Sequence, residues 1–500
     1  MSKKKFFTLL LAFVTALTMS LAGTALAADT WDGTVGIVPA PVNNVITITT
    51  GAQLAAVATQ VNAGTADANT FNGKTIRLAN DVNLNGHDWT PIGCFFNYGN
   101  ANNRAFCGVF DGAGYTISGL SVTNNQANWS TRGETAALFG YIDFPAASAK
   151  SAPAKASAVT PAAMAAADVS ALGLSGTEAD KVLAERTAFY EAFGVKQSAP
   201  MTRTTTASTG GVVKNLKVKG TVANTYGQGA AGIVCWNDGA VENCYFEGTV
   251  SNQQTRTRSY CGGISSLLGA STRIVNCVVS GDIQAYGSLS YGGGVAGYCY
   301  AMGSGYIVNC SVQPGTSVYS NMDTGGIVGG FASKVYNCVS AATTVNVSDT
   351  VASENEDKRN YTGGIVGAYG TVYNCYWLHG GELQPNYAVG SGSDTNGRKT
   401  SLSNLPIGSV LLPSISFAAG SSAALTAVTY PTNAAGSVPI YSWSATSGLT
   451  VSNVTTKTTT VGASAAGTGT VTATVTDATN WTTMSSPHTV TAESFVTATN

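Results

Sequence analysis

The chain is poor in charge. Only 10% of its 500 residues are Asp, Glu, Lys or Arg, and its formal net charge is −1. Proteins that bind nucleic acids rely largely on clustered Lys and Arg to neutralise phosphates. The composition therefore gives no reason to expect a nucleic acid partner.

Histidine is also scarce, with three residues in the whole chain: His87, His379 and His488. Zinc peptidases of the common helical type need His-Glu-x-x-His, in which two imidazoles one turn apart hold the metal and the Glu activates water. None of the three histidines is followed by Glu. The sequence therefore predicts neither this class of peptidase nor a metal site, and we expect no cofactor.

Long apolar runs are missing after the first residues. Lys3 to Lys5 precede an apolar run from Phe6 to Leu21, and Ala25-Leu-Ala27 offers small residues for cleavage. This order is typical of a secretory signal peptide over residues 1–28, whereas a retained anchor would need a longer apolar core. We expect a secreted or cell-surface protein with no transmembrane segment after signal removal. Leu405-Pro-Ile-Gly408 departs from the Leu-Pro-x-Thr-Gly sorting motif, so how the protein is held at a surface is not predicted.

What the chain does contain is a repeated phrase: an apolar residue, any residue, Asn, and then Leu or Cys. Its Asn residues lie 28, 33, 33, 28 and 37 positions apart, a spacing typical of stacked coils. A second, Gly-led phrase such as Gly325-Gly-Ile-Val-Gly329 follows after a loop of variable length. Two fixed strands with length variation between them indicate a parallel β-helix. The Asn residues of the phrase are Asn215, Asn243, Asn276, Asn309, Asn337 and Asn374.

Five of the ten cysteines follow these Asn residues, in the slot that Leu216 occupies in an earlier coil. A slot that accepts Leu or Cys is an apolar interior slot, so we predict a buried thiol stack. We interpret the Asn residues as a structural ladder of side-chain amides along the coils. Cys94 and Cys107 bracket a polar loop and could close it as a disulfide. The stacked residues are Cys244, Cys277, Cys310, Cys338 and Cys375, and no pairing is predicted for Cys235, Cys261 and Cys299.

The remaining segments differ in pattern. Residues 52–61 have apolar positions at helical spacing and are suited to capping the open end of a solenoid. Residues 145–209 are Ala-rich and of low complexity around one charged helical segment. We predict an all-β protein with an N-terminal capping helix and a partly helical insertion. Its expected divisions are an extended leader at 29–50, a β-helix at 51–378 with the insertion at 145–209, a linker at 379–407, and a β-sandwich at 408–500.

Several of these residues together resemble the GLUG-repeat proteins that bacteria export. The resemblance implies a right-handed parallel β-helix of the pectin-lyase type, in a family that includes surface adhesins and the non-catalytic parts of immunoglobulin A peptidases. Near the C-terminus, Trp443 and residues 466–477 are similar to bacterial immunoglobulin-like group 2 domains, which are small β-sandwiches, and the domain could be incomplete. The GLUG features are Trp89-Thr-Pro-Ile-Gly93, Phe110-Asp-Gly112, Gly119-Leu120, Leu138-Phe-Gly140 and the Gly-Gly-Ile-Val-Gly and Asn-Cys-Tyr repeats.

Tyrosines recur just before the Gly-led phrase, at Tyr260, Tyr291 and Tyr361, with Asp323 interrupting the row. Because neighbouring coils are about 4.8 Å apart, these rings could form an aromatic strip for sugar stacking or protein contact, or a packed corner. The loop that carries Arg256 and Arg258 could add a polar rim to such a site or be merely solvated.

Catalysis on a polysaccharide would need clustered carboxylates for acid and base work, or for calcium. Asp81 and Asp111 are the best candidates, but we find no carboxylate pair that recurs on neighbouring coils. The run from Asp81 to Asn85 imitates a calcium loop, although Ile92 stands where an EF-hand needs Glu. We therefore predict no catalytic residue and no enzyme.

The expected function is that of an exported, non-enzymatic surface protein. It would act as an adhesin or binding scaffold for a host or environmental glycan or protein, and its oligomeric state is not predicted. Two alternatives remain open. One is a polysaccharide lyase or glycoside hydrolase on the β-helix, and the other is a purely structural component of the cell envelope.

Overall fold

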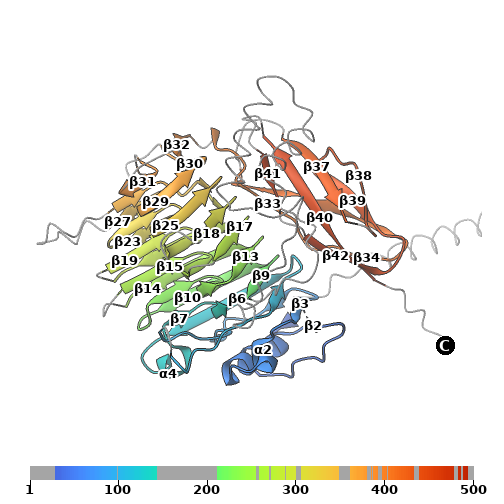
Figure 1. Ribbon diagram of the computed structural model, residues 1–500, viewed down its shortest axis with the longest axis horizontal. Helices are drawn as coiled ribbons and strands as arrows, with labels where there is room; N and C mark the ends of the chain where they lie inside the picture. Colours follow the sequence, from blue (N-terminus) through green and yellow to red (C-terminus); the bar gives the residue numbers. More distant parts are fainter. Residues whose placement is uncertain are drawn as a thin grey trace, which may run out of the picture. The chain divides into compact units, whose positions relative to one another are not determined.

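The fold is a stack of parallel coils, seen in a computed structural model. The structure describes residues 29–97, 100–143, 211–254, 258–269, 272–287, 289–299, 306–347, 361–379, 385, 387–391, 397–401, 404–432, 439–446, 448–477, 482–485 and 488–493. The predicted signal peptide and the insertion at 145–209 lie outside these residues. Figure 1 shows the strands layered one coil above the next, from β2 and β3 beside α2 to β30 and β32.

Three parallel sheets build the coils. The first contains β1 (Asp29–Thr30), β4 (Val82–Asn83), β6 (Thr116–Asn124), β10 (Lys217–Asn224), β14 (Tyr245–Asn252), β18 (Val278–Ala285), β22 (Ser311–Val312), β23 (Ser317–Ser320), β26 (Val339–Ser340), β27 (Thr344–Val347), β30 (Cys375–Leu378) and β32 (Gly397–Thr400). The second contains β7 (Thr135–Ala136), β11 (Gly229–Ala231), β15 (Arg258–Gly262), β19 (Leu289–Gly293), β24 (Asp323–Gly325) and β28 (Tyr361–Gly363).

The third sheet carries two rows of strands, which β25 (Val328–Tyr336) and β29 (Val366–Tyr373) join. One row contains β8 (Phe139–Asp143), β12 (Val234–Asp238), β16 (Ser265–Leu268), β20 (Ala296–Cys299) and β31 (Val389–Ser391). The other row contains β2 (Val45–Ile48), β3 (Thr75–Leu78), β5 (Val109–Asp111), β9 (Val212–Lys214), β13 (Ala240–Glu242), β17 (Arg273–Val275) and β21 (Tyr306–Val308). The predicted all-β fold with a parallel β-helix is confirmed.

The repeated Asn marks a sharp bend between two strands of each coil. In all six phrases the backbone of this Asn adopts the left-handed conformation, with φ between 51° and 54°. Asn tolerates this conformation better than other residues with a side chain, because its short amide can hydrogen-bond locally. The amides also join along the stack: Asn243 donates to Asn215 at 2.9 Å, and Asn374 donates to Asn337 at 2.9 Å. One residue type thus makes the bend and links neighbouring coils.

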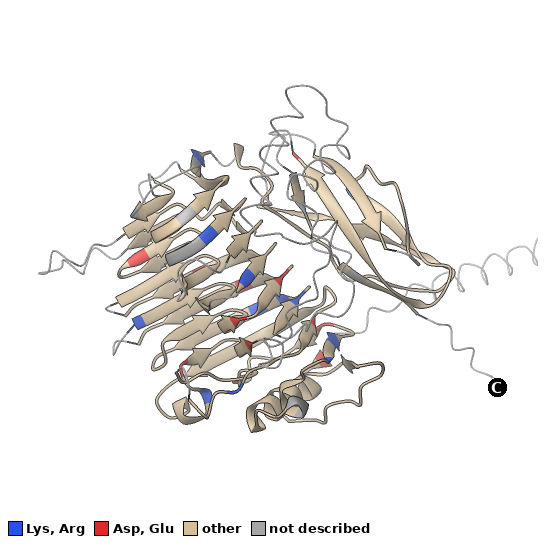
Figure 2. Ribbon diagram, in the orientation of Figure 1, with Lys and Arg blue, Asp and Glu red and all other residues tan. Residues whose placement is uncertain are grey.

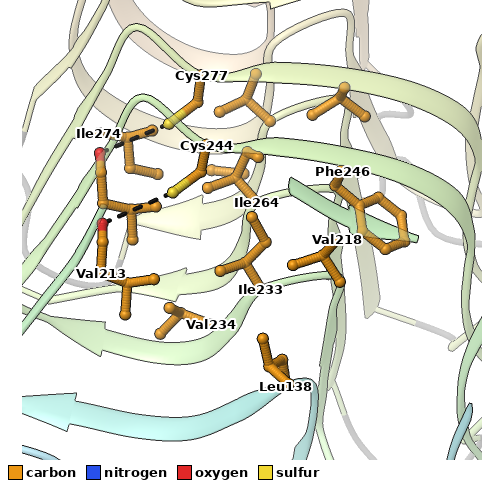
Figure 3. Close-up of a cluster of buried hydrophobic side chains, with 14 of the residues drawn as sticks. Leu138, Val213, Val218, Ile233, Val234, Cys244, Phe246, Ile264, Ile274 and Cys277 are labelled. Atoms are coloured by element: carbon orange, nitrogen blue, oxygen red, sulfur yellow. Dashed lines mark hydrogen bonds between the residues drawn. The ribbon is translucent and has the colours of Figure 1, made fainter. Parts of the chain in front are cut away.

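The slot after this Asn points into the coil interior. The five cysteines that occupy it have no exposed surface. Figure 3 shows Cys244 and Cys277 among Ile233, Ile264 and Phe246, with each thiol directed at a backbone carbonyl in a strand of the preceding coil. Leu216 occupies the same slot and is 2% exposed, so the stack is part of the apolar core.

The first coil is covered by α2 (Gly51–Ala63), close to the helix that the sequence predicts. Thr50 caps it by accepting a hydrogen bond from the Gln53 backbone at 3.2 Å. Its apolar face is buried through Leu54, Val57 and Val61. Two single-turn helices, α3 (Asp67–Thr70) and α4 (Trp129–Arg132), lie in later loops.

The coils extend beyond the predicted limits of 51–378. Within the predicted leader, β1 pairs with β4 and β2 with β3, and within the predicted linker, β31 pairs with β29 and β32 with β30. These segments lack the Asn phrase, which is why the sequence pattern did not assign them to the β-helix.

The C-terminal segment forms small sheets around a separate apolar core that includes Trp443 and Val471. A pair contains β33 (Ser409–Leu411) and β36 (Val428–Tyr430). A five-stranded sheet contains β34 (Ser416–Ala418), β37 (Ile440–Ala445), β40 (Gly467–Thr476), β41 (Thr482–Met484) and β42 (His488–Glu493). A three-stranded sheet contains β35 (Ser422–Thr426), β38 (Thr450–Ser452) and β39 (Thr458–Gly462). The predicted relation to immunoglobulin-like group 2 domains stays a prediction.

Candidate functional site

Each Gly-led phrase turns the chain from a strand of the second sheet into a strand of the third. A side chain at Gly263 would collide there, since a Cβ atom would lie 2.4 Å from Val279 and 2.6 Å from the Gly294 carbonyl. The turn is therefore tight, and outward-facing residues on its two sides come close together. This outer corner repeats from coil to coil.

Aromatic side chains fill the corner. Tyr260 pairs in register with Tyr291 on the second sheet, and Trp236, Leu267 and Tyr298 form one register row on the third. These residues belong to a single apolar cluster, separate from the core inside the coils. We call this cluster the aromatic corner; its members are Phe95, Tyr141, Trp236, Tyr260, Leu267, Tyr291, Tyr298 and Met322.

The rings of the aromatic corner stack along the solenoid. Phe95 and Trp236 are stacked with their centroids 3.7 Å apart, and Tyr260 and Tyr291 are stacked at 5.5 Å. Tyr298 meets Tyr291 edge to face at 4.7 Å. Tyr260 and Tyr291 are only 2% and 6% exposed, whereas Tyr298 is half-buried. The partly accessible ring of Tyr298 therefore packs on the buried rings of Tyr260 and Tyr291.

The structure places the predicted binding residues unevenly. Tyr260 and Tyr291 lie inside the aromatic corner, and Tyr361 lies further along the same register row, 6.1 Å from Tyr369 between ring centroids. Arg258 is exposed, and a hydrogen bond with Tyr260 raises the pKa of its guanidinium. Arg256 lies outside the described residues.

Asp323 takes the place of tyrosine in this row, in register with Tyr291 on one side and Tyr361 on the other. The residue is 1% exposed. One carboxylate oxygen, Oδ1, accepts a long hydrogen bond of 3.4 Å from the Tyr361 backbone N–H. Burial raises the pKa of Asp323 to about 7, against the smaller opposing effect of this hydrogen bond.

A pair of carboxylates stands at the end of the aromatic corner where Tyr141 and Trp236 lie. Asp143 and Asp238 are in register on adjacent strands. The Tyr141 hydroxyl donates at 2.8 Å to Asp143 and lies 3.4 Å from Asp238, and the Trp236 indole N–H donates to Asp238 at 3.2 Å. Burial, and then the charge of Asp143, raises the pKa of Asp238 to about 6. The expectation that neighbouring coils carry no carboxylate pair was therefore wrong.

Sequence alone did not reveal this pair, because Asp143 and Asp238 lie on opposite sides of the long insertion at 145–209. A usable signal did exist. In each Gly-led phrase, one Gly comes directly before the apolar residue. The residue four positions after this Gly is Trp236, Leu267 or Tyr298, and Tyr141 occupies the equivalent position in its own coil. Asp143 and Asp238 follow Tyr141 and Trp236 at the same offset of two.

The earlier acidic candidates have structural partners. Asp111 has no exposed surface and accepts hydrogen bonds from Asn215 Nδ2 at 3.0 Å and from the Ala113 backbone at 3.0 Å. Although burial acts to raise it, Lys214, the Asn215 hydrogen bond and Arg77 together hold the pKa of Asp111 below its usual value. Asp81 accepts a hydrogen bond of 2.7 Å from the Thr116 backbone. Both carboxylates therefore hold neighbouring coils together.

The suggested disulfide between Cys94 and Cys107 is not formed, and all ten cysteines are free thiols. Cys94 pairs through its backbone with Arg104 rather than Cys107, and its thiol is directed at the Asn102 carbonyl at 3.6 Å. The Cys107 backbone instead donates to Thr70 at 2.8 Å. The two thiols therefore have different neighbours. Burial raises the pKa of Cys94 to about 11.

Figure 2 shows that few charged residues lie on the described strands. Among the described residues no cluster of three or more His, Cys, Asp or Glu side chains is arranged to hold a metal ion. No helix in the described ranges has the length and apolar character needed to cross a membrane.

Comparison with known proteins gives one structural likeness. No family model and no curated protein matches the chain. A solved structure from Bacteroides ovatus, described as a "putative immunoglobulin A1 protease", is similar over 72% of this chain and 84% of that chain, with 15% identity and a TM-score of 0.38. The GLUG resemblance thus stays a prediction.

The prediction that the chain is not an enzyme is corrected. The similar protein carries the name of a peptidase. In addition, that prediction depended on the absence of paired carboxylates, and Asp143 and Asp238 form such a pair.

Proposed function

We propose that this protein is exported and binds a carbohydrate polymer along the aromatic corner. The observation that carries the proposal is the series of stacked rings on successive coils, from Phe95 and Trp236 to Tyr291 and Tyr298. Binding sites typically combine apolar and aromatic surface with a few polar groups that fix orientation. Sugar rings suit such a surface, because one face is rich in C–H groups while the hydroxyls point outward.

The geometry favours a polymer over a single sugar. Neighbouring coils are about 4.8 Å apart, and the corner continues through several of them. An extended chain lying along the solenoid would cross several coils and meet the half-buried rings of Tyr141 and Tyr298 on the way. The carboxylate of Asp323 and the guanidinium of Arg258 border this path and could take its hydroxyls.

Export is part of the proposal and is supported by the start of the chain. Lysines followed by an apolar run and Ala25-Leu-Ala27 are the features of a secretory signal. A role in attaching a bacterial cell to a glycan surface would follow from export together with binding. Comparison of medium, cell wall and cytoplasm by immunoblotting would test the location.

Binding can be tested with a panel of immobilised polysaccharides and two tyrosine variants. Tyr298→Ala removes a half-buried ring of the corner, while Tyr387→Ala removes a ring that is 68% exposed and lies outside it. Loss of a stacking aromatic costs about 1 kcal/mol or more, so we expect Tyr298→Ala to weaken retention at least several-fold and Tyr387→Ala to leave it unchanged. Equal retention by both variants, or none by the parent, would refute the proposal.

Glycoside cleavage is a second candidate function, favoured by the carboxylate pair alone. Asp238, with its raised pKa of about 6, could protonate a glycosidic oxygen, and Asp143 could act as base or nucleophile. Release of new reducing ends from polysaccharides would reveal the activity. Asp238→Asn and Asp143→Asn should each reduce it at least about 100-fold, while leaving retention on the polymer intact.

A further inference from the structure

Asp323 is the exception in a row that otherwise presents tyrosine. Tyr260, Tyr291, Asp323 and Tyr361 occupy successive coils in register, so the repeat could have placed a fourth ring here. The sequence supplies a carboxyl instead, and the structure keeps it 99% buried, since only 1% of the residue is exposed.

The carboxyl is poorly satisfied where it lies. Oδ1 receives only the 3.4 Å hydrogen bond from Tyr361, and within the described part of the chain no donor reaches Oδ2. Buried carboxylates usually have charge partners or several hydrogen bonds, because leaving one without them costs free energy. Here the cost is visible as a raised pKa, about 7, caused by burial. Such a group needs an explanation other than stability.

We infer that Asp323 is the polar anchor of the aromatic corner, where its second carboxylate oxygen accepts a hydroxyl of a neutral sugar unit stacked on the half-buried ring of Tyr361. The inference rests on the proposed function and adds to it a specificity-determining residue and a ligand class. A hydroxyl is a small donor, so it suits a nearly buried carboxylate that lies between Tyr291 and Tyr361 in the register row.

The charges along the corner favour a neutral ligand over an acidic one. Among the described residues of the corner, Asp143, Asp238 and Asp323 are acidic, and the cation Arg258 acts on Tyr260, Tyr291 and Tyr298. A polymer with one carboxylate on every sugar would bring like charges beside partly buried carboxylates, which is repulsive. A neutral polymer meets no such penalty and supplies the hydroxyl donors.

The groups that face Asp323 allow a specific pH dependence. Tyr291 on β19 and Tyr361 on β28 flank it. Burial, and then the charge of Asp323, raises the pKa of Tyr291. Arg258 acts on the same Tyr291. Asp323, whose pKa is raised to about 7 by burial, changes its charge near neutral pH. Because a carboxylate is a stronger acceptor than a carboxylic acid, binding should strengthen as Asp323 ionises.

The test is calorimetric titration of the full chain with soluble neutral polymers (β-glucan, xylan and galactomannan) and with polygalacturonate, at pH 6 and pH 8. We compare the parent with Asp323→Asn, which keeps the shape, Asp323→Tyr, which restores the repeat, and Tyr387→Ala, which removes an exposed ring outside the corner. Thermal unfolding of each variant checks its fold.

We expect the parent to bind a neutral polymer more tightly at pH 8 than at pH 6 and to bind polygalacturonate weakly. Asp323→Asn and Asp323→Tyr should lose roughly 10- to 100-fold in affinity at pH 8, as expected for a hydrogen bond to a charged group, and should lose the pH dependence. Tyr387→Ala should keep both the affinity and the pH dependence.

Three results would overturn the inference. If Asp323→Asn binds like the parent at both pH values while Tyr298→Ala still weakens binding, the anchor is wrong and the carbohydrate-binding function stands. If polygalacturonate binds more tightly than every neutral polymer, the ligand class is wrong. If the parent binds no polymer, the inference falls together with the proposed function.

Discussion

The side-chain amide of Asn276 makes two hydrogen bonds with the backbone of Val410. The Asn276 Oδ1 atom accepts from the Val410 N–H at 2.8 Å, and its Nδ2 donates to the Val410 carbonyl. The same Nδ2 also donates to Asn243 in the ladder. One amide of the repeated phrase thus makes the bend, links two coils and holds β33.

This relationship predicts an unequal cost for removing the ladder amides. Asn276→Ala leaves buried backbone groups unpaired and puts Ala at a φ of 53°, so we expect a loss of about 2 to 4 kcal/mol. Asn276→Gly keeps the bend and should cost about 1 kcal/mol less. Asn374→Ala, at an exposed end of the ladder, should cost less than either. Chemical denaturation measures all three, and equal losses at positions 276 and 374 would refute the explanation.

The thiol stack makes a second prediction, for chemical reactivity. All ten cysteines are buried and free. Because a buried thiol ionises with difficulty and reagents cannot reach it, a thiol reagent should label none of them in the native protein and all ten after unfolding. Fewer than ten labelled thiols in unfolded, unreduced protein would reveal a disulfide and contradict the structure.

The slot itself can be tested at Cys310. Leu occupies the equivalent position in an earlier coil, so an apolar residue is acceptable there and a hydroxyl is not. Cys310→Ser should destabilise the protein by about 1 to 3 kcal/mol, and Cys310→Val by less. The opposite order in thermal unfolding would mean that the slot is polar.

His488 predicts a loss of stability in acid. Burial, with a smaller contribution from Lys214, lowers its pKa to about 4, although Asp111 opposes the shift. An unfolded chain binds a proton there near pH 6.5, so the stabilising contribution is complete above that pH and is lost as the pH falls toward about 4. His488→Gln should show a flatter decline than the parent, by up to about 3 kcal/mol over this range. Parallel pH profiles would contradict the burial of a neutral imidazole.

Asp323 should make the free energy of unfolding depend on pH in the opposite direction. Its carboxyl holds a proton up to about pH 7 when folded, whereas an unfolded Asp releases it near pH 3.8. The fold therefore loses stability at this residue as the pH rises from about 4 to 7. Asp323→Asn should remove this loss and raise stability at pH 8 by about 1 to 3 kcal/mol. A less stable variant at pH 8 would show that the carboxylate has partners that satisfy it.

The repeat was readable from sequence because each coil repeats the same physical constraint. Asn followed by Leu or Cys, at near-regular spacing, indicates a bend with an apolar residue after it, and the coils form as expected. The sequence pattern did not reveal that the Asn is left-handed, because Asn is also a common choice for ladders and turns. It also could not reveal that Asn276 would meet Val410, which lies 134 positions away.

Only part of the aromatic corner could be predicted from the sequence. The tyrosine row follows from the repeat, but whether Tyr260 and Tyr291 are exposed depends on Tyr298, which approaches from the other side of the Gly-led turn. Asp143 and Asp238 needed the register across the insertion. Variable loops hide such register, because the fixed phrases and not the intervals between them set which side chains become neighbours.

The most direct measurement of the central claim maps the bound polymer on the unmodified protein. Oxidative footprinting with mass spectrometry, with and without a neutral polysaccharide that binds, reports the accessibility of each tyrosine. The proposal predicts that Tyr298 and Tyr361 become protected, while Tyr387, which is 68% exposed and outside the corner, stays equally reactive. Protection of Tyr387 with no change at Tyr298 and Tyr361 would place the ligand elsewhere and contradict the account.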